Sequence, residues 1–587
     1  MENVTVVSPL IMGQHFSNES YEDPSILNDN DAAFHSAGLK SNGGERISKF
    51  LDSIGPLESK CGRFQLGYTL IVPLMRYFNK VNGDWHLNTD ALFNTLDTIK
   101  SVERPVVVYL SANHFTDANN VMIDELCADP TNVMWDRNGP MEPDDYFGHK
   151  VVAWTLSNYD AKITKFRSEA FRASVRHLMS LPEKAKKRIT AISMLGEVHD
   201  MIPDFIKGPG RHVPLHTTTD YSPTSKHGFR SWLADKFGTV DKFRQTTGLV
   251  VSSFNEVEPP AGLTDRPSDR VDLSSSGTLT IYGWLHDAKS RDFVIDVLLN
   301  GNVVGEALYG LSRTDVVDDV PEITNPNIGY EFKLDFRSLR DGEHVIDLVV
   351  RTHDQSPLHM GRRTVSIGGN VAANTALVHD IASIYTAVGH DPALSGAIDG
   401  PRNNSEHTYN PLSDLWLQYR NLVVRNYLDH FANIALEEGA AKSLLFSHQM
   451  AAKLYGTWES DLIATDLMQQ NPANYNHGVT LYGGTSFGDP LKKMIKNLGW
   501  SRFGVNELHP GVPLDAETYQ KIFEDCHKNG AVFMSPYYMS IVPPRLLSGS
   551  KLDRFLINEK NEQCGSSLYW KAIVNLMNKA PKKAKSR

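Results

Sequence analysis

The chain alternates between short apolar runs and longer stretches with helical spacing, and this alternation limits the folds open to it. Strand-like runs separated by helical patterns are typical of βα units and a parallel sheet. Eight runs predict a (β/α)₈ TIM barrel of the α/β class. They cover residues 66–75, 105–110, 151–156, 189–195, 443–446, 478–482, 502–505 and 531–534. The helical patterns between them cover residues 89–101, 168–180, 226–237, 414–438, 490–498 and 515–528. An open doubly wound sheet is the competing topology, but it calls for a glycine-rich phosphate loop after an early strand, and the sequence has none.

One segment breaks the alternation. Between residues 263 and 370 the helical period disappears, and short strand-like runs are separated by turn pairs such as Asn300-Gly301 and Asp341-Gly342. This pattern predicts an immunoglobulin-like β-sandwich inserted into a barrel loop. The predicted divisions are residues 1–262 and 371–545 for the two parts of the barrel, 263–370 for the sandwich, and 546–587 for an extension with a basic tail.

Composition narrows the class of partner. The chain of 587 residues has 59 Lys and Arg against 69 Asp and Glu, a net charge of −10, which does not suit a dedicated nucleic-acid binder. No apolar run approaches the length of a membrane span, and the first residues lack the pattern of a signal peptide. Four scattered cysteines without a CxxC pair favour a reducing compartment. We therefore expect a cytoplasmic protein without a membrane span, and its assembly into homo-oligomers stays open.

Polar residues that follow barrel strands point toward the active-site end of the fold. Of the eight predicted strand ends, two carry a carboxylate within two residues of the apolar run, and these are Glu197 after the fourth and Glu507 after the seventh. Two facing carboxyl groups suit cleavage of a glycosidic bond, because one donates a proton to the leaving oxygen while the other attacks the anomeric carbon. Surface or salt-bridged glutamates are the alternative interpretation.

The other strand ends and nearby loops supply candidates for sugar binding. Histidines there could instead be structural, and aromatic residues could belong to the core. The candidates are Arg76, Asn113, His114, Asn158, His199, His448, Gln449, Trp458, Tyr482, His509 and Tyr537. No His-Glu-x-x-His motif or regular set of metal ligands is present, so we expect neither a metal nor another cofactor.

Several motifs carry a resemblance to a known group of enzymes. Residues 221–243 contain Phe229-Arg-Ser-Trp-Leu233 followed by Phe237-Gly-Thr239, and residues 506–511 read Asn-Glu-Leu-His-Pro-Gly. Together with the glutamates after strands four and seven, they resemble glycoside hydrolase clan A, and most closely family 42, the β-galactosidases. Residues 414–426 resemble the family's helix before strand five, and residues 282–287 resemble the opening of carbohydrate-associated Ig-like modules.

The resemblance implies a retaining enzyme with Glu197 as acid/base and Glu507 as nucleophile. The sequence departs from the clan pattern at Gly196, where an Asn that contacts the sugar 2-hydroxyl normally precedes the acid/base. Asn158 is the candidate for supplying that contact instead. The cysteines also lack the spacing of the four-cysteine zinc site found in many family 42 members.

Three functions therefore stand side by side. The first is hydrolysis of a β-linked oligosaccharide or polysaccharide with retention. The second is glycan binding without catalysis, which the Gly196 departure motivates. The third is transglycosylation in polysaccharide assembly, with the same residues but a drier acceptor site. The distance between the Glu197 and Glu507 carboxyl groups is the observation that separates these glutamates from ordinary surface ones.

Overall fold

The structure is a computed structural model of the whole chain. It describes residues 4–25, 42–112, 120–146, 149–200, 202–203, 216–261, 269–272, 274–353, 355–368, 380–381, 384–385, 388–451, 454, 462–467, 472–547 and 551–578. In this part of the chain, no helix has both the length and the apolar character to cross a membrane.

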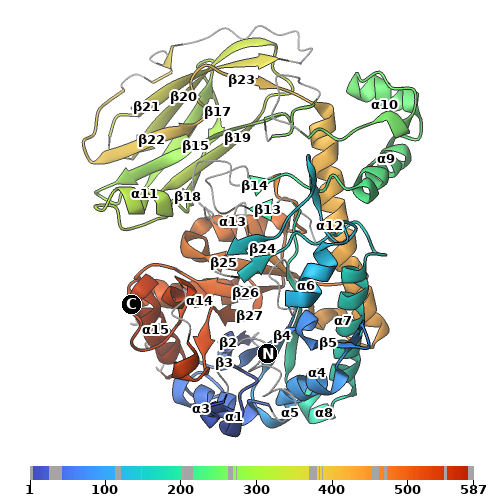
Figure 1. The fold of residues 1–587 in the computed structure, drawn as a ribbon. Helices are drawn as coiled ribbons and strands as arrows, with labels where there is room; N and C mark the ends of the chain where they lie inside the picture. Colours follow the sequence, from blue (N-terminus) through green and yellow to red (C-terminus); the bar gives the residue numbers. More distant parts are fainter. Residues whose placement is uncertain are drawn as a thin grey trace.

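The larger part of the molecule is a parallel barrel, as the strand and helix pattern predicts (Figure 1). Nine strand segments occupy eight positions, because β3 and β4 run on from one another with only Gly67 between them. The last strand pairs with β1, and β1 pairs with β3, which closes the ring. In order around the barrel the strands are β1 (Thr5–Val7), β3 (Phe64–Leu66) with β4 (Tyr68–Pro73), β7 (Val106–Ser111), β12 (Ile189–Glu197), β24 (Leu445–Met450), β25 (His477–Tyr482), β26 (Phe503–His509) and β27 (Ala531–Pro536).

The strand prediction needs two corrections. The first barrel strand is β1, which the sequence reading missed because three residues are too few to show a periodic pattern. The run at 151–156 is not a barrel strand: only Val151 belongs to a strand, in the hairpin of β10 (Asp144–Tyr146) and β11 (His149–Val151). Its apolar residues are buried in the main core outside the sheet. The two errors cancel, so that β12 and β26 are still the fourth and seventh strands.

Helices pack around the barrel where their apolar faces predict them. Caps fix several starts: the Asn410 side chain accepts the Leu412 amide at the start of α12, and Asp515 accepts the Glu517 and Thr518 amides at the start of α14. The described helices of eight or more residues are α3 (Gly44–Ile54), α4 (Thr89–Leu96), α6 (Asn120–Cys127), α7 (Lys162–Ser180), α9 (Pro223–Phe237), α10 (Val240–Thr247), α12 (Pro411–Glu437), α13 (Asp489–Leu498), α14 (Ala516–Lys528) and α15 (Ser566–Asn578). The last of these lies in the predicted C-terminal extension and packs against α14.

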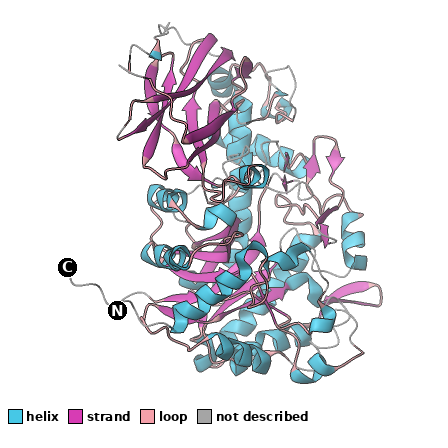
Figure 2. Cartoon of the chain, turned by 90° about the vertical axis from the view of Figure 1, so that its left-hand side faces the viewer, coloured by secondary structure: helices cyan, strands magenta, loops and turns pink. Residues whose placement is uncertain are grey.

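Two sheets, antiparallel except for the parallel pair of β21 and β23, form a sandwich beside the barrel (Figures 1 and 2). One sheet has the order β18-β19-β15-β22 and the other β17-β16-β20-β21-β23, and their inner faces share one apolar core. The sheets extend past residue 370, because β22 pairs with β15 and β23 pairs with β21. The strands are β15 (Thr278–Asp287), β16 (Phe293–Leu299), β17 (Asn302–Glu306), β18 (Leu308–Leu311), β19 (Gly329–Asp335), β20 (Gly342–Thr352), β21 (Leu358–Gly368), β22 (Leu394–Gly400) and β23 (Ser405–Thr408).

A buried ion pair fixes the loop after β12 to α12, the long helix that runs from the sandwich down the side of the barrel in Figure 1. Only 1% of the Arg420 side chain and 2% of the Asp200 side chain are exposed. The guanidinium of Arg420 lies 3.4 Å from Asp200 Oδ1 and donates to the Leu462 carbonyl at 2.8 Å. The pair therefore anchors a segment that begins three residues after Glu197.

Replacing Arg420 with Met should lower the free energy of unfolding by about 3–5 kcal/mol, because the buried Asp200 would lose its cationic partner. Urea unfolding followed by tryptophan fluorescence measures this change. Arg425→Met is the matched control on the same helix: the Arg425 side chain is 36% exposed and lies 3.9 Å from Asp429, so its loss should cost less than about 1 kcal/mol. Equal losses for the two variants would contradict the anchoring role.

Candidate active site

The fourth strand carries Glu197 into the end of the barrel by an irregularity in its backbone. Between Ser193 and Glu197 strand β12 advances four residues while β24 advances two, from Phe446 to His448. Leu195 and Gly196 absorb the two extra residues at φ values of 63° and 99°. The value at Gly196 lies in a region that glycine adopts readily and other residues do not, which gives a physical reason for a glycine before Glu197.

A second irregularity, in β26, places Glu507. Val505 pairs with Val479 and Glu507 pairs with Thr480, so that Asn506 is one extra residue in the strand. Neighbouring residues of a regular strand point to opposite faces. The extra residue lets Asn506 reach Ser193 across the barrel while Glu507 faces the same end of the barrel as Glu197.

The two glutamates meet there. Carboxylate oxygens of Glu197 and Glu507 and a ring nitrogen of His448 all lie within 4.8 Å of one another. The Glu507 side chain is 14% exposed, so it is largely buried but can be reached from solvent. The distance between the Glu197 and Glu507 carboxyl groups is therefore short, as expected for a functional pair and not for unrelated surface glutamates.

The same three side chains are the group in the described part of the chain that could hold a metal ion. A tetrahedral zinc ion with bonds of about 2.1 Å would hold its ligand atoms roughly 3.4 Å apart. His448 Nε2 lies 3.6 Å from Glu507 Oε1 but 3.0 Å from Thr480 Oγ1, so the ring already has a closer partner. The arrangement fits a pair of carboxyl groups with polar neighbours better than a preformed metal centre.

Burial and mutual repulsion set the protonation of the pair. Burial raises the pKa of Glu197, and a hydrogen bond from Thr480 opposes this rise. Burial and then the charge of Glu197 raise the pKa of Glu507, and a hydrogen bond from Tyr482 opposes that rise. Two like charges this close disfavour double ionisation, so the pair holds one proton near neutral pH.

An aromatic wall surrounds Glu507. The Tyr482 hydroxyl donates to Glu507 Oε2. The Tyr482 ring meets that of Tyr537 edge to face at 5.3 Å, and Tyr109 packs on His448 at 4.7 Å. Aromatic faces at a polar site are suitable surfaces for a sugar ring.

Replacing Tyr482 with Phe should raise the pKa of Glu507, because the ionised carboxylate loses a hydrogen bond. The acidic limb of the kcat/KM profile should then move to higher pH by about one unit, with a loss of roughly 10- to 100-fold in kcat/KM. On the function proposed below, hydrolysis of an activated aryl β-glycoside as a function of pH measures both effects. Tyr519→Phe is the control, since this buried hydroxyl bonds to the Val512 and Gly565 carbonyls. An unchanged acidic limb in Tyr482→Phe would show that the hydroxyl does not act on Glu507.

Two of the predicted histidines support the backbone around the glutamates. His199 is buried, and its Nδ1 lies 2.7 Å from the Glu197 carbonyl oxygen. His509 Nδ1 accepts the Gly511 amide, and its Nε2 lies 3.3 Å from Ser566 Oγ at the start of α15. Burial lowers the pKa of both histidines, to about 4 for His199 and about 3 for His509, so both are neutral at physiological pH.

Two of the predicted site residues, Asn158 and Gln449, point away from the glutamates. Asn158 lies in the loop before α7. Its Nδ2 donates to the Thr131 carbonyl, and its Oδ1 accepts the Asp160 backbone amide. It does not end a barrel strand, so the expectation that it replaces the missing amide at position 196 is wrong in its premise. Gln449 is fully buried next to His448 on β24, and strand alternation directs it to the opposite face.

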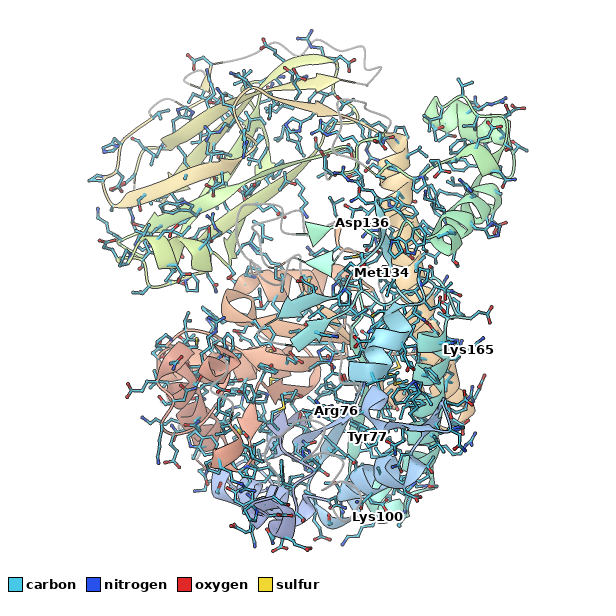
Figure 3. All side chains as sticks on the ribbon, in the orientation of Figure 1. Arg76, Tyr77, Lys100, Met134, Asp136 and Lys165 are labelled. Atoms are coloured by element: carbon cyan, nitrogen blue, oxygen red, sulfur yellow. The ribbon has the colours of Figure 1, made fainter. Side chains whose placement is uncertain are left out.

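Arg76 lies in the 3₁₀ helix η1 (Leu74–Tyr77), which follows β4 in the barrel part of the molecule (Figure 3). Its charge, after burial, contributes to lowering the pKa of His15 to about 3. The remaining predicted site residues, Asn113, His114 and Trp458, lie outside the described residues.

The sequence reading missed Ser193, Thr480 and Tyr109 as members of the site. All three point into the barrel from within strands, whereas candidates were sought at strand ends. Ser193 and Thr480 did carry a signal, since each is a polar residue inside an apolar strand run. Buried polar side chains in such runs need partners, and here Ser193 and Thr480 share His448 as a partner.

The sandwich contacts the segment that follows Tyr482. Asn327 donates through Nδ2 to the Phe487 carbonyl at 3.0 Å. A Cβ atom on Gly484 would lie 2.1 Å from Asn327 Oδ1, so this glycine is required for the close approach. The sandwich therefore packs against the barrel beside the two-carboxyl site.

Similarity to known proteins is found among solved structures. No protein-family profile matches the chain, and no curated protein sequence matches it. Among solved structures, the catalytic domain of β-amylase from Paenibacillus polymyxa superposes with a TM-score of 0.47 at 10% identity, covering 98% of this chain and 99% of that one. A β-galactosidase from the Antarctic haloarchaeon Halorubrum lacusprofundi gives 0.46 at 9%, and one from Bacillus circulans sp. alkalophilus gives 0.42 at 8%.

The alignments with these two β-galactosidases cover 98% of this chain but 57% of each of theirs. Identities near 10% at such TM-scores do not identify a reaction. What this chain does must therefore be inferred from its own carboxyl groups and their neighbours.

Proposed function

We propose that the protein is a retaining glycoside hydrolase that cleaves a β-linked oligosaccharide or polysaccharide, with Glu507 as nucleophile and Glu197 as acid/base. The observation that carries this proposal is the approach of the two carboxyl groups to within 4.8 Å at the end of a (β/α)₈ barrel. Retaining glycosidases hold their carboxyl groups about 5–5.5 Å apart, whereas inverting enzymes need about 6.5–9.5 Å to fit a water molecule.

The assignment of roles rests on the resemblance at strands four and seven. Glu507 accepts the Tyr482 hydroxyl and Glu197 a hydrogen bond from Thr480, and each of these bonds favours the ionised form of its acceptor. With the shared proton on Glu197, this residue donates it to the glycosidic oxygen while Glu507 attacks C1. The bond from C1 to the leaving oxygen breaks as the ester to Glu507 forms.

The second half of the reaction follows from the same repulsion. Once Glu507 is esterified it carries no charge, so the pKa of Glu197 falls and this residue becomes a base. Glu197 then takes a proton from water, whose oxygen attacks C1 and releases Glu507. A sugar hydroxyl in place of water would make the same step a transglycosylation.

The β-linkage rests on the motifs shared with family 42, and the sugar is left to experiment. A panel of 4-nitrophenyl β-D-glycosides, including galactoside, glucoside, xyloside and mannoside, tests the activity directly. Release of nitrophenol by the wild type and its loss in both Glu197→Gln and Glu507→Gln would support the proposal. Equal activity in the wild type and the double variant would overturn it.

Glycan binding without catalysis remains the second candidate, because Gly196 stands where clan A enzymes carry the Asn that holds the sugar 2-hydroxyl. Titration calorimetry with oligosaccharides, paired with chromatography of the same samples after several days, separates the two. Tight binding with intact oligosaccharide would favour the binding protein.

A further inference from the structure

A run of buried polar side chains crosses the inside of the barrel and ends at Glu197. Asn506 Nδ2 donates to Ser193 Oγ at 2.6 Å, and Ser193 Oγ lies 3.4 Å from His448 Nδ1. On the other side of the ring, His448 Nε2 lies 3.0 Å from Thr480 Oγ1, and Thr480 is hydrogen bonded to Glu197. The four side chains come from four different strands, β26, β12, β24 and β25, and all are buried.

The chemistry of the two ends gives this run a direction. The amide nitrogen of Asn506 can only donate, so it occupies a lone pair of Ser193. In the described part of the chain, Ser193 has one other side-chain partner, His448 Nδ1, to which its own proton can go. At the far end the hydrogen bond from Thr480 lowers the pKa of Glu197, so Thr480 gives its single proton to a Glu197 oxygen that carries no proton.

His448 is therefore constrained from both sides. It is completely buried, and burial lowers its pKa to about 3, so the ring is neutral and carries one N–H. If the proton were on Nδ1, the Ser193 hydroxyl would have no acceptor, and Thr480 would have to donate to Nε2 instead of to Glu197. If the proton is on Nε2, each hydroxyl in the run both accepts and donates. Buried polar groups strongly favour the arrangement in which partners are satisfied.

We propose that Asn506, Ser193, His448 and Thr480 form a directional hydrogen-bond relay that holds His448 as the Nε2–H tautomer and keeps the Thr480 hydroxyl proton directed at Glu197. These four are positioning residues. The proton exchange with substrate takes place at Glu197, where the relay ends. The tautomer follows from the contacts alone, and the effect on the reaction rests on the function proposed above.

The relay predicts a specific effect on the acid/base. A donor that stays on Glu197 stabilises its ionised form, which lowers the pKa of Glu197 and helps it act as a base in the second half of the reaction. Loss of that donor raises the pKa, so the basic limb of kcat/KM should move to higher pH. The titratable groups that face Glu197 are the same in every relay variant, and they are Glu507, Tyr482, His448 and His199. Tyr109 packs on the His448 ring and is also unchanged.

Ser193→Ala is the decisive variant, because the contacts of the Ser193 side chain are with Asn506 and His448 and not with either carboxyl group. If the relay directs Thr480, removing this hydroxyl should shift the basic limb upward by about one pH unit. Thr480→Val should give a shift at least as large, and Thr480→Ser should restore the wild-type limb. Ser8→Ala is the matched control, a buried serine inside the same barrel that contacts Ser535.

A basic limb that moves in Thr480→Val but not in Ser193→Ala would reduce Thr480 to a local donor and overturn the relay.

A second measurement needs neither activity nor a relay variant that folds. The ¹⁵N shifts of selectively labelled histidine, with His448 assigned by its absence in His448→Gln, should show a protonated Nε2 and an unprotonated Nδ1. A protonated Nδ1 would refute the relay while leaving the proposed hydrolysis untouched, whereas absence of hydrolysis with the expected tautomer would refute only the reaction.

Discussion

Glu507→Ala is expected to lose at least about 10⁴-fold in kcat on any β-glycoside that the wild type cleaves, because the proposed mechanism forms the glycosyl ester on this carboxylate. Azide should restore part of the turnover by entering the space that the carboxylate leaves. The product should be a glycosyl azide of inverted configuration, since azide attacks C1 once and directly. Mass spectrometry and NMR of the product test this result.

Glu559→Ala is the control for this variant, since Glu559 is exposed in a loop and its loss should leave kcat unchanged. Full turnover by Glu507→Ala would show that the nucleophile lies elsewhere. Loss of turnover without rescue by azide, at unchanged thermal stability, would argue against the covalent route.

Glu197→Ala should separate substrates by their leaving groups. Proton donation contributes about 10²- to 10⁴-fold, so unactivated alkyl or sugar leaving groups should lose that much. Dinitrophenolate needs no proton to leave, so the formation of the glycosyl ester from a 2,4-dinitrophenyl glycoside should be nearly as fast as in the wild type. Its breakdown should be slow, because the base that activates water is missing.

Pre-steady-state kinetics would show this as a burst of dinitrophenol followed by slow turnover, which azide accelerates. The same fold loss for good and poor leaving groups would contradict the acid/base assignment. The contrast with Glu507→Ala, which should lose the burst itself, keeps the two roles apart.

The position of the glutamate pair could be predicted because it depends on a simple pattern. An apolar run marks a barrel strand, and a carboxylate directly after it lies at the strand's C-terminal end. The prediction tolerated the loss of β1 and the false strand at 151–156, since these errors cancel in the count. The inserted sandwich was equally visible, because strand-like runs with Asn-Gly and Asp-Gly turns replace the helical period.

What could not be predicted depends on backbone irregularities and long-range pairing. The extra residues in β12 and β26 turn Glu197, Asn506 and Glu507 inward, and a regular alternation would not bring Asn506 and Glu507 to one face. The strands β22 and β23 have few apolar residues, so their pairing beyond residue 370 left no clear pattern. His509 and Gln449 follow strands as the glutamates do, but local geometry directs His509 to α15 and Gln449 to the outer face.

The most direct test is to identify the residue that becomes glycosylated. Incubation with 2,4-dinitrophenyl 2-deoxy-2-fluoro-β-D-glycosides of galactose, glucose and xylose should trap the ester, because the fluorine slows its hydrolysis more than the good leaving group slows its formation. Proteolysis and mass spectrometry would then locate the label. A single fluoroglycosyl group on Glu507, absent from Glu507→Gln and still formed in Glu197→Ala, is the predicted result. A label on Glu197, or hydrolysis of the parent glycosides with inversion and no trapped ester, would contradict the double displacement.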